Sequence, residues 1–174
     1  VIEAGVIVQE LGVLKATSFD AAGARGGDLD VLRLSGHLLL EEDVVLRAEK
    51  VELSGVVVTE ANGVIDAKDV SQNGLVQVGG DLSIDGDVVL NGGAIVSTGS
   101  MRVSFMEGHN DGVMQSTGNM TITGDQLDQV GVVKGGTVEI TVGDVTNNGR
   151  VVSDDGLRIV VDQLMNKGVM QSTG

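Results

Sequence analysis

The sequence predicts an all-β fold: a right-handed parallel β-helix, in which short strands wind into a solenoid of about 19-residue coils. Three observations lead to this prediction. One residue pattern returns at nearly constant spacing from Gln72 onward, apolar and polar residues alternate within each unit, and the composition is rich in glycine and poor in aromatics. The repeat is too short for a helix plus a strand, but it accommodates two or three short strands per coil.

The repeat is marked by a glycine that opens each unit. Successive opening glycines are 19, 19, 19, 18 and 19 residues apart. They are Gly74, Gly93, Gly112, Gly131, Gly149 and Gly168. A period near 20 residues is typical of a stacked solenoid, so we expect equivalent residues of successive units to lie above one another.

Within a unit, hydrophobicity alternates with period two, which indicates strands rather than helices. The position two residues after each opening glycine is always apolar, whereas the next position is often polar. The first of these positions is therefore predicted to face inward: Val76, Ile95, Met114, Val133, Val151 and Met170. A second strand in each unit carries a pair of apolar residues, such as Leu82 with Ile84, and these pairs are expected to complete the core.

A second glycine column falls between the two strands of a unit. It comprises Gly80, Gly99, Gly118 and Gly136, and Asp155 interrupts it before Gly174. Glycine in this place suits a corner whose backbone needs a positive φ. We predict that these residues are corner glycines, and that a looser third side completes each coil.

An amide residue stands two positions before each opening glycine. The column comprises Gln72, Asn91, Asn110, Gln129, Asn147 and Asn166. In a stack of coils, buried Asn or Gln side chains can hydrogen-bond to their counterparts above and below, forming an asparagine ladder like those of cross-β assemblies. The alternative is that Asn forms an ordinary turn before glycine. Gln72 and Gln129 favour the ladder, because Gln is a poor turn residue.

Composition restricts the remaining possibilities. The 174 residues suit one domain and include 27 glycines, no Cys, Pro, Trp or Tyr, and only Phe19 and Phe105 as aromatics, as the narrow interior of a β-helix would predict. Without Cys, disulfides and thiolate metal sites are excluded. The net charge of −14 argues against nucleic acid as a partner, because that binding needs clustered Lys or Arg. No apolar run approaches the roughly 20 residues of a membrane helix, so no membrane insertion is expected.

The chain is expected to be a single β-helical segment, 1–174, with less regular coils or a cap in 1–70 and regular repeats in 71–174. The first 28 residues fit either a cap or a coil with a long loop at Asp20 to Gly27. The final stretch, Gly168 to Gly174, duplicates Gly112 to Gly118 residue for residue. We therefore expect a fragment of a longer shaft, whose exposed coil ends associate end to end.

No catalytic, cofactor-binding or metal site is predicted. His37 and His109 each sit beside a glycine without a second His or a Cys at ligand spacing, which favours surface histidines. The acidic stretch Asp81 to Asp87 is expected to face outward rather than hold calcium. Carboxylate pairs such as Asp154 with Asp155, or those in Glu41 to Asp43, meet the spacing for glycoside hydrolysis by chance, and no Tyr or Trp is present to stack on a sugar.

The recurring pattern Asn-x-Gly-(Val/Ile)-(Met/Val)-x-Ser-x-Gly-x-(Leu/Met)-x-Ile occurs in Asn110 to Ile122 and, with variations, in Asn91 to Val103 and Asn147 to Ile159. It resembles the haemagglutinin repeats of filamentous haemagglutinin and related two-partner-secretion exoproteins, including contact-dependent growth-inhibition sticks. The resemblance covers about Gln72 to Gly174. It implies a secreted shaft, exported through an outer-membrane partner transporter, whose other regions bind a receptor on a host or neighbouring cell. The Asn-Pro motifs of the family's secretion domain are absent, since the chain has no proline.

Three functional classes remain open at this point. One is the shaft of a surface exoprotein that acts in adhesion or virulence, and another is an intracellular β-helical polymer resembling bactofilins. The last is a carbohydrate-active β-helix such as a polysaccharide lyase or a phage tailspike. The nearly constant unit length favours the shaft, because a carbohydrate-active β-helix is expected to carry long, irregular substrate loops.

Overall fold

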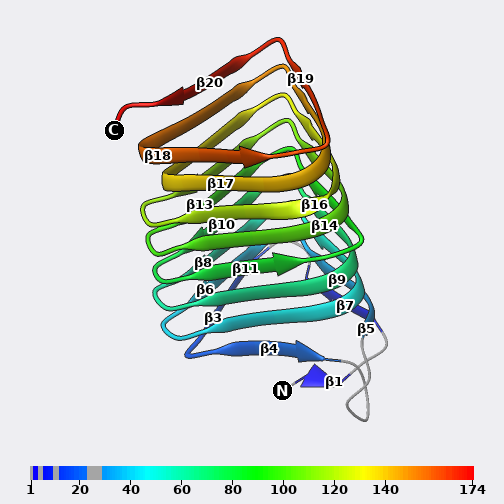
Figure 1. Cartoon of the computed structure of the whole chain (residues 1–174). Coiled ribbons are helices and arrows are strands. Elements are labelled where there is room, and N and C mark those ends of the chain that lie inside the picture. The colour runs from blue at the N-terminus through cyan, green and yellow to red at the C-terminus, as the bar shows by residue number, and fades with distance from the viewer. Residues whose placement is uncertain (1, 4–5, 10–11, 23–28) are drawn as a thin grey trace.

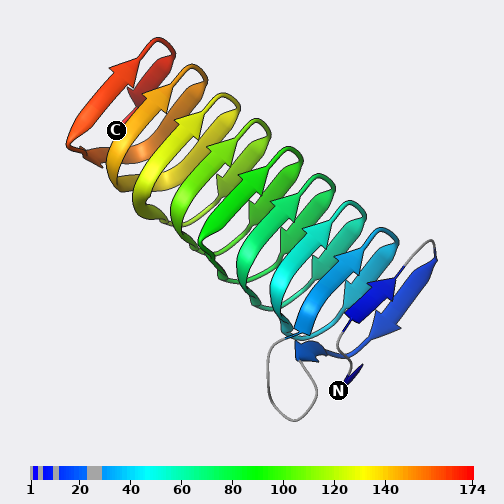
Figure 2. The ribbon, with the colours of Figure 1, turned by 90° about the vertical axis from the view of Figure 1, so that its right-hand side faces the viewer.

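The computed structural model describes residues 2–3, 6–9, 12–22 and 29–174. Their strands pair in parallel within one continuous sheet. The sheet winds around an axis as a right-handed parallel β-helix with coils of about 19 residues, which confirms the predicted fold class (Figure 1). In side view the coils lie one behind another along a single stack (Figure 2).

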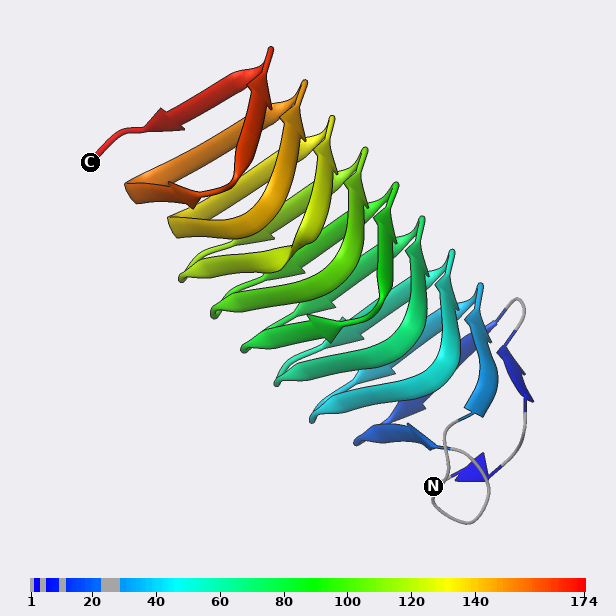
Figure 3. The same ribbon diagram turned by 45° about the vertical axis from the view of Figure 1, so that its right-hand side comes forward.

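Each coil has three faces, which are numbered here in chain order after the opening glycine (Figure 3). The first face is a ladder of short strands, each paired with its equivalent in the next coil. These strands are β3 (Val13–Ala16), β6 (His37–Leu40), β8 (Val56–Thr59), β10 (Leu75–Val78), β13 (Ala94–Ser97), β15 (Val113–Ser116), the beginnings of β17 (Val132–Asn147) and β18 (Arg150–Val160), and β20 (Val169–Ser172).

The second and third faces are joined in several coils by one bent strand. Continuous strands of this kind are β7 (Val44–Leu53), β9 (Gly63–Gln72), β14 (Met101–Asn110) and β16 (Met120–Gln129), while β17 extends over all three faces and β18 over the first two. Separate strands on the second face are β1 (Ile2–Glu3), β4 (Phe19–Ala22) and β11 (Leu82–Asp85). Those on the third face are β2 (Val6–Gln9), β5 (Leu29–Leu34), β12 (Val88–Asn91) and β19 (Gln163–Asn166).

Equivalent residues of successive coils pair directly, at an offset of 19 residues in most of the stack. The offset is longer near the N-terminal end, where Val13 pairs with His37 and Phe19 with Val44, and it is shorter in the unit that opens at Gly131. Before its first corner Lys134 still pairs with Gln115, but after that corner Val138 pairs with Met120, so the missing residue is taken out between the first and second faces. The next coil restores the full length by a register shift between Gly135 and Thr137.

Inward-facing side chains form one apolar core along the axis. The position two residues after the opening glycine is buried from Val76 to Val151, as predicted, and Met170 is partly buried because it lies in the last described coil. On the second face, Ile84 and Met120 are fully enclosed. Each such side chain contributes about 1.5 to 3 kcal/mol relative to an exposed one.

The core accepts an aromatic ring at Phe105, at the corner between the second and third faces, because glycines surround it. Phe105 pairs in register with Gly124 of the next coil. A Cβ added to Gly124 would lie 2.3 Å from the Phe105 ring, and one added to Gly108 would lie 2.6 Å from it. The ring therefore fills the space that these glycines leave free. In earlier coils the same corner holds small buried side chains, such as those of Ala48 and Ala67.

The coil pattern extends back into the first seventy residues. Strands β3 and β4 pair in register with β6 and β7, so residues 13–22 already follow the winding of the later coils. Asp20 lies in β4, whereas most of the predicted long loop, residues 23–28, lies outside the described residues.

Candidate functional site

The predicted amide column lies inside the corner between the third and first faces. Gln72, Asn91, Asn110, Gln129 and Asn147 are each at most 1% exposed. Asn166 occupies the same register position, paired with Asn147, but it is exposed because no described coil covers it. The column therefore lies in the interior rather than on the turn surface.

Direct bonds between amides join some of these residues into a ladder. The Nδ2 of Asn91 donates to Oδ1 of Asn110 at 2.7 Å, and the Nδ2 of Asn110 donates to Oε1 of Gln129 at 2.7 Å. Asn147 donates in the same direction to Asn166 at 2.8 Å. Each bond runs from one coil to the next toward the C-terminal end.

The same amides also bind the backbone of the next coil. The Nδ2 of Asn110 donates to the carbonyl oxygen of Val132 at 3.3 Å, and the equivalent bonds of Asn91 and Gln72 reach Val113 at 3.2 Å and Ala94 at 3.0 Å. The acceptor in each case follows the opening glycine of the coil above, as Val132 follows Gly131 rather than Gly112. Each amide thus holds the end of the third face to the start of the first face one coil later, a role that the sequence pattern did not indicate.

The ladder is interrupted at two levels. Gln72 does not bond to the side chain of Asn91, although the two pair in regular register, and Oε1 of Gln72 and Oδ1 of Asn91 have no partner. Across the shortened unit, Gln129 Nε2 is without a partner, while Oδ1 of Asn147 accepts the N–H of Gly149 at 3.2 Å. At Asn147, the expected ladder and the alternative turn chemistry are therefore both present.

A second polar column closes the corner between the first and second faces. Its members are buried hydroxyl residues at the end of the first-face strand: Thr59, Ser97, Ser116 and Ser153. Ser97 Oγ donates to the carbonyl of Gly80 at 2.7 Å, and Ser153 Oγ donates to the carbonyl of Gly136 at 2.8 Å. Both acceptors belong to the previous coil, as does the Glu42 carbonyl to which Thr59 donates, whereas Ser116 donates to Gly118 of its own coil.

The predicted reason for the corner glycines is wrong. Among the described glycines only Gly12 has a positive φ, of 132°, so Gly80, Gly99, Gly118 and Gly136 do not adopt that conformation. Lack of space explains them instead. A Cβ on Gly99 would lie 2.3 Å from Oδ1 of Asp81, and one on Gly136 would lie 2.8 Å from the carbonyl oxygen of Thr117.

The opening glycines are crowded even more closely. A Cβ on Gly74, Gly112 or Gly131 would come within 2.0 Å of the carbonyl oxygen of the equivalent glycine one coil earlier. The N–H of each residue after an opening glycine donates to that same oxygen, as Val132 does to Gly112 at 2.8 Å. Side-chain volume at this corner would therefore displace a backbone hydrogen bond between coils.

Aspartates that the sequence singled out cap the outer edge of the stack. The Oδ1 of Asp43 accepts the N–H of Asn62 at 2.9 Å, Oδ1 of Asn62 accepts the N–H of Asp81 at 2.9 Å, and Oδ1 of Asp81 accepts the N–H of Ser100 at 2.7 Å. These bonds again connect neighbouring coils. Asp85, Asp87, Asp154 and Asp155 are exposed.

Charged side chains on the outer faces pair along the same axis. Arg33 donates to Glu52, Lys68 to Glu49 and Arg158 to Glu139, each across one coil. The Arg33 guanidinium, with Lys50 beside it, lowers the pKa of Glu52 below its ordinary value. These groups are exposed, so each pair adds little to stability.

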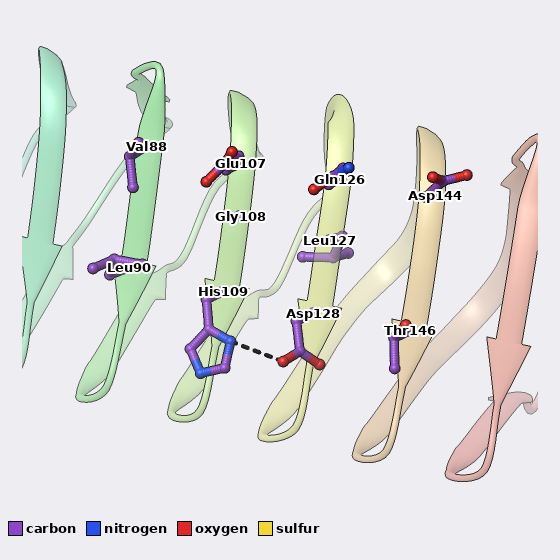
Figure 4. A pocket seen from close by; sticks show the side chains of 10 residues that line it. All are labelled: Val88, Leu90, Glu107, Gly108, His109, Gln126, Leu127, Asp128, Asp144 and Thr146. Carbon is purple, nitrogen blue, oxygen red and sulfur yellow. Dashed lines mark ion pairs between the residues drawn. The ribbon is translucent and has the colours of Figure 1, made fainter.

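His109 is the one predicted surface histidine that joins a cluster. Its Nε2 lies 2.8 Å from Oδ2 of Asp111, and its Nδ1 lies 3.2 Å from Oδ2 of Asp128. Figure 4 shows His109 and Asp128 pointing toward each other from β14 and β16. The sequence carries this signal, because a separation of 19 residues places the two side chains on adjacent coils, although no motif with ligand spacing contains the pair. His37 is exposed on β6.

This cluster borders a shallow groove of about 430 Å³ on the third face. Val88 and Leu90 line one part of it, and Glu107 and Asp144 line another (Figure 4). Both ring nitrogens of His109 face carboxylates, so neither is aimed into the groove as a general base. Within the described residues, no group of three or more His, Cys, Asp or Glu side chains is placed to hold a metal ion, and no helix is long and apolar enough to cross a membrane.

Comparison with known proteins finds no matching family model, curated protein or solved structure. What the chain does must therefore be inferred from its own residues.

The amide column leads to a stability prediction for Asn110→Ala. This change leaves Oε1 of Gln129 without its donor and removes the acceptor of Asn91 Nδ2. Because each unsatisfied buried polar group costs about 1 to 3 kcal/mol, we expect a clear loss in the free energy of unfolding by chemical denaturation. Asn110→Gln, which keeps an amide in the column, should cost less.

Gln115→Ala is the matched control for Asn110→Ala. Gln115 is an exposed amide in the following strand, so its loss should change stability by no more than about 0.5 kcal/mol. Equal effects of Asn110→Ala and Gln115→Ala would show that the column is ordinary turn chemistry.

A pair of glycine substitutions tests the spatial explanation of the glycine columns. Gly131→Ala places a Cβ 1.9 Å from the carbonyl oxygen of Gly112, and we expect it to cost about 1 to 3 kcal/mol or more. Gly156→Ala meets no atom within 4 Å and has no positive φ, so it should be neutral or stabilise by about 0.4 to 1 kcal/mol. Thermal or denaturant unfolding measures both, and a harmless Gly131→Ala would contradict the explanation.

Proposed function

We propose that this chain is a structural shaft segment of a large secreted bacterial surface exoprotein, which acts as an adhesin or as the stick that presents a tip toxin or receptor-binding region. The observation that carries the proposal is the regular linkage between coils. Backbone ladders, buried amides and buried hydroxyls all connect one coil to the next, whereas the described outer faces carry a shallow groove and exposed ion pairs. Such an arrangement suits a long, stiff rod.

The proposal takes its cellular setting from the resemblance to haemagglutinin repeats. That resemblance rests on the residues now seen to build the corners: the amide before the opening glycine, the hydroxyl at the end of the first strand and the glycine that follows it. Partners would then be an outer-membrane transporter during export and a host or neighbouring-cell receptor contacted by other regions. The acidic surface, with its net charge of −14, does not favour nucleic acid.

Turn length supports a shaft over a carbohydrate-active β-helix. From β7 to β20, only a few residues separate one described strand from the next, and several strands continue from one face into another. A long substrate-binding loop would interrupt this sequence of strands. His109, which lines the groove on the third face, is held between the carboxylates of Asp111 and Asp128.

Surface exposure of the protein in the cells that produce it tests the proposal. A short epitope inserted between Glu41 and Glu42, in an exposed turn, should be detected by antibody on intact cells and removed by external protease. Deleting the gene for the partner transporter should abolish that signal while leaving the protein detectable in lysates.

Two other results would contradict the shaft. An epitope protected in intact cells and recovered only after lysis would indicate an intracellular polymer. Turnover of a polysaccharide panel by the purified chain, lost on Glu107→Gln or Asp128→Asn but kept in the exposed control Asp87→Asn, would indicate a carbohydrate-active enzyme.

A further inference from the structure

The outward surface of the first face differs in composition from the rest of the rod. Alternate residues of β6, β8, β10, β13, β15 and of the beginnings of β17 and β18 point outward, because the residues between them are buried. None of these outward residues is acidic, and most are apolar. They are His37, Leu39, Val56, Val58, Leu75, Gln77, Ala94, Val96, Val113, Gln115, Val132, Lys134, Arg150 and Val152.

Carboxylates are concentrated on the other two faces of the same coils. Asp66 and Asp85 lie on the second face, and Glu107, Asp128 and Asp144 lie on the third. The net charge of the chain is −14, and like charges brought together across an interface oppose association. Of the three faces of these coils, the first is therefore the one along which two copies can meet without opposing rows of carboxylates.

The first face also has a regular shape that a second copy can match. Val56, Leu75, Ala94, Val113 and Val132 pair in register and form one column along the stack. Sheets with such columns pack face to face about 10 Å apart. The seven strands cover roughly 30 Å by 13 Å, or about 400 Å². This is less than the roughly 800 Å² per partner of a standard interface, so contact between two first faces should be weak and reversible.

A groove at the N-terminal part of the face provides a complementary charge. It has a volume of about 490 Å³ and is lined by Leu39 and Val58 together with Glu41 and Glu60, while Lys15 borders it from the preceding coil. Both glutamates are exposed. An apolar wall beside carboxylates suits a side chain with an apolar stem and a cationic end.

Lys134 is a side chain of this kind at the opposite part of the same face. Its Nζ lies 3.6 Å from Oδ2 of Asp154, and the side chain is 43% exposed. Five successive strand pairings separate the coil of Leu39 from that of Lys134, which is about 24 Å along the axis. Lys134 therefore cannot reach the groove of its own chain, but it can reach that of a second copy.

We propose that two copies associate side by side through their first faces, with their stack axes antiparallel and Lys134 of each copy in the groove of the other. A two-fold axis along the strand direction makes both contacts equivalent and closes the assembly at a dimer. In this register Val113 faces Val56, Leu75 faces Ala94 and Lys134 faces Leu39. The contact uses no strand at either end of the stack and does not depend on the secreted setting proposed above.

Substitutions of Val113 test whether the face is covered by a second copy. Sedimentation velocity of the purified chain over a range of concentrations should show a reversible monomer–dimer equilibrium. Val113→Asp and Val113→Lys should each weaken dimerisation about tenfold, because either change places a charge against an apolar column. Ser83→Asp and Ser83→Lys are the matched controls on the second face and should leave the equilibrium close to wild type. If net charge alone governed association, Val113→Lys would strengthen it.

A charge exchange tests the antiparallel register. Lys134→Glu should weaken dimerisation about two- to tenfold, as should Glu41→Lys combined with Glu60→Lys, because each dimer contains the ion pair twice. The chain carrying all three changes should dimerise nearly as well as the wild type. Restoration of this kind reports on a contact between copies, since these residues are too far apart to meet within one chain.

Three results would overturn the proposal: a chain that stays monomeric at millimolar concentration, Val113 variants that behave like the Ser83 variants, or a charge exchange that restores nothing. A monomeric chain that binds phosphatidylcholine vesicles through Val113 would assign the face to a lipid surface instead. Circular dichroism of each variant verifies that its fold is retained.

Discussion

The interactions between neighbouring coils of this molecule are constrained by stacking at a strand spacing of about 4.8 Å. Each side chain contacts the equivalent side chains of the coils before and after it. The residue type at each position must therefore be able to pack or bond with residues of a similar type. Apolar positions satisfy this by packing, and outer charges satisfy it when signs alternate, as in Arg33 with Glu52. Buried polar positions satisfy it only with groups that both donate and accept, which is what Asn, Gln and Ser provide.

The corners are where this constraint is most demanding, because the backbone turns there while the ladders must continue. Glycine leaves room for the carbonyl of the previous coil, and the amide and hydroxyl columns bind backbone groups of neighbouring coils. The fold does not depend on the amide at every level, since Leu34 and Leu53 occupy the same column in earlier coils and are buried. The amides are better explained as groups that fix the register of the coils in the regular part of the stack. Where neighbouring amides do not match, polar atoms are left without a hydrogen-bond partner, as at Gln72 and Gln129.

The period of the glycines was sufficient to predict the fold class, and alternation was sufficient to predict which positions are buried, because both follow directly from strand geometry. Other features depend on distances between coils that a single unit does not reveal. The sequence suggests a positive φ for the corner glycines, whereas their cause is crowding by side-chain and carbonyl oxygens of the previous coil. The bond from each amide to the residue after the opening glycine one coil later also has no signature within a single unit. The contact of His109 with Asp128 was predictable in principle from their separation, but only once each outward position is compared across coils.

The central claim is that buried amides hold neighbouring coils together from inside the stack. Hydrogen exchange of side-chain amides, followed by nuclear magnetic resonance, measures this directly. The Nδ2 hydrogens of Asn110, bonded to Gln129 and Val132 and fully buried, should exchange orders of magnitude more slowly than those of Asn73, an exposed Asn whose Nδ2 bonds only to Ser71. Equal exchange rates for Asn110 and Asn73 would contradict the claim.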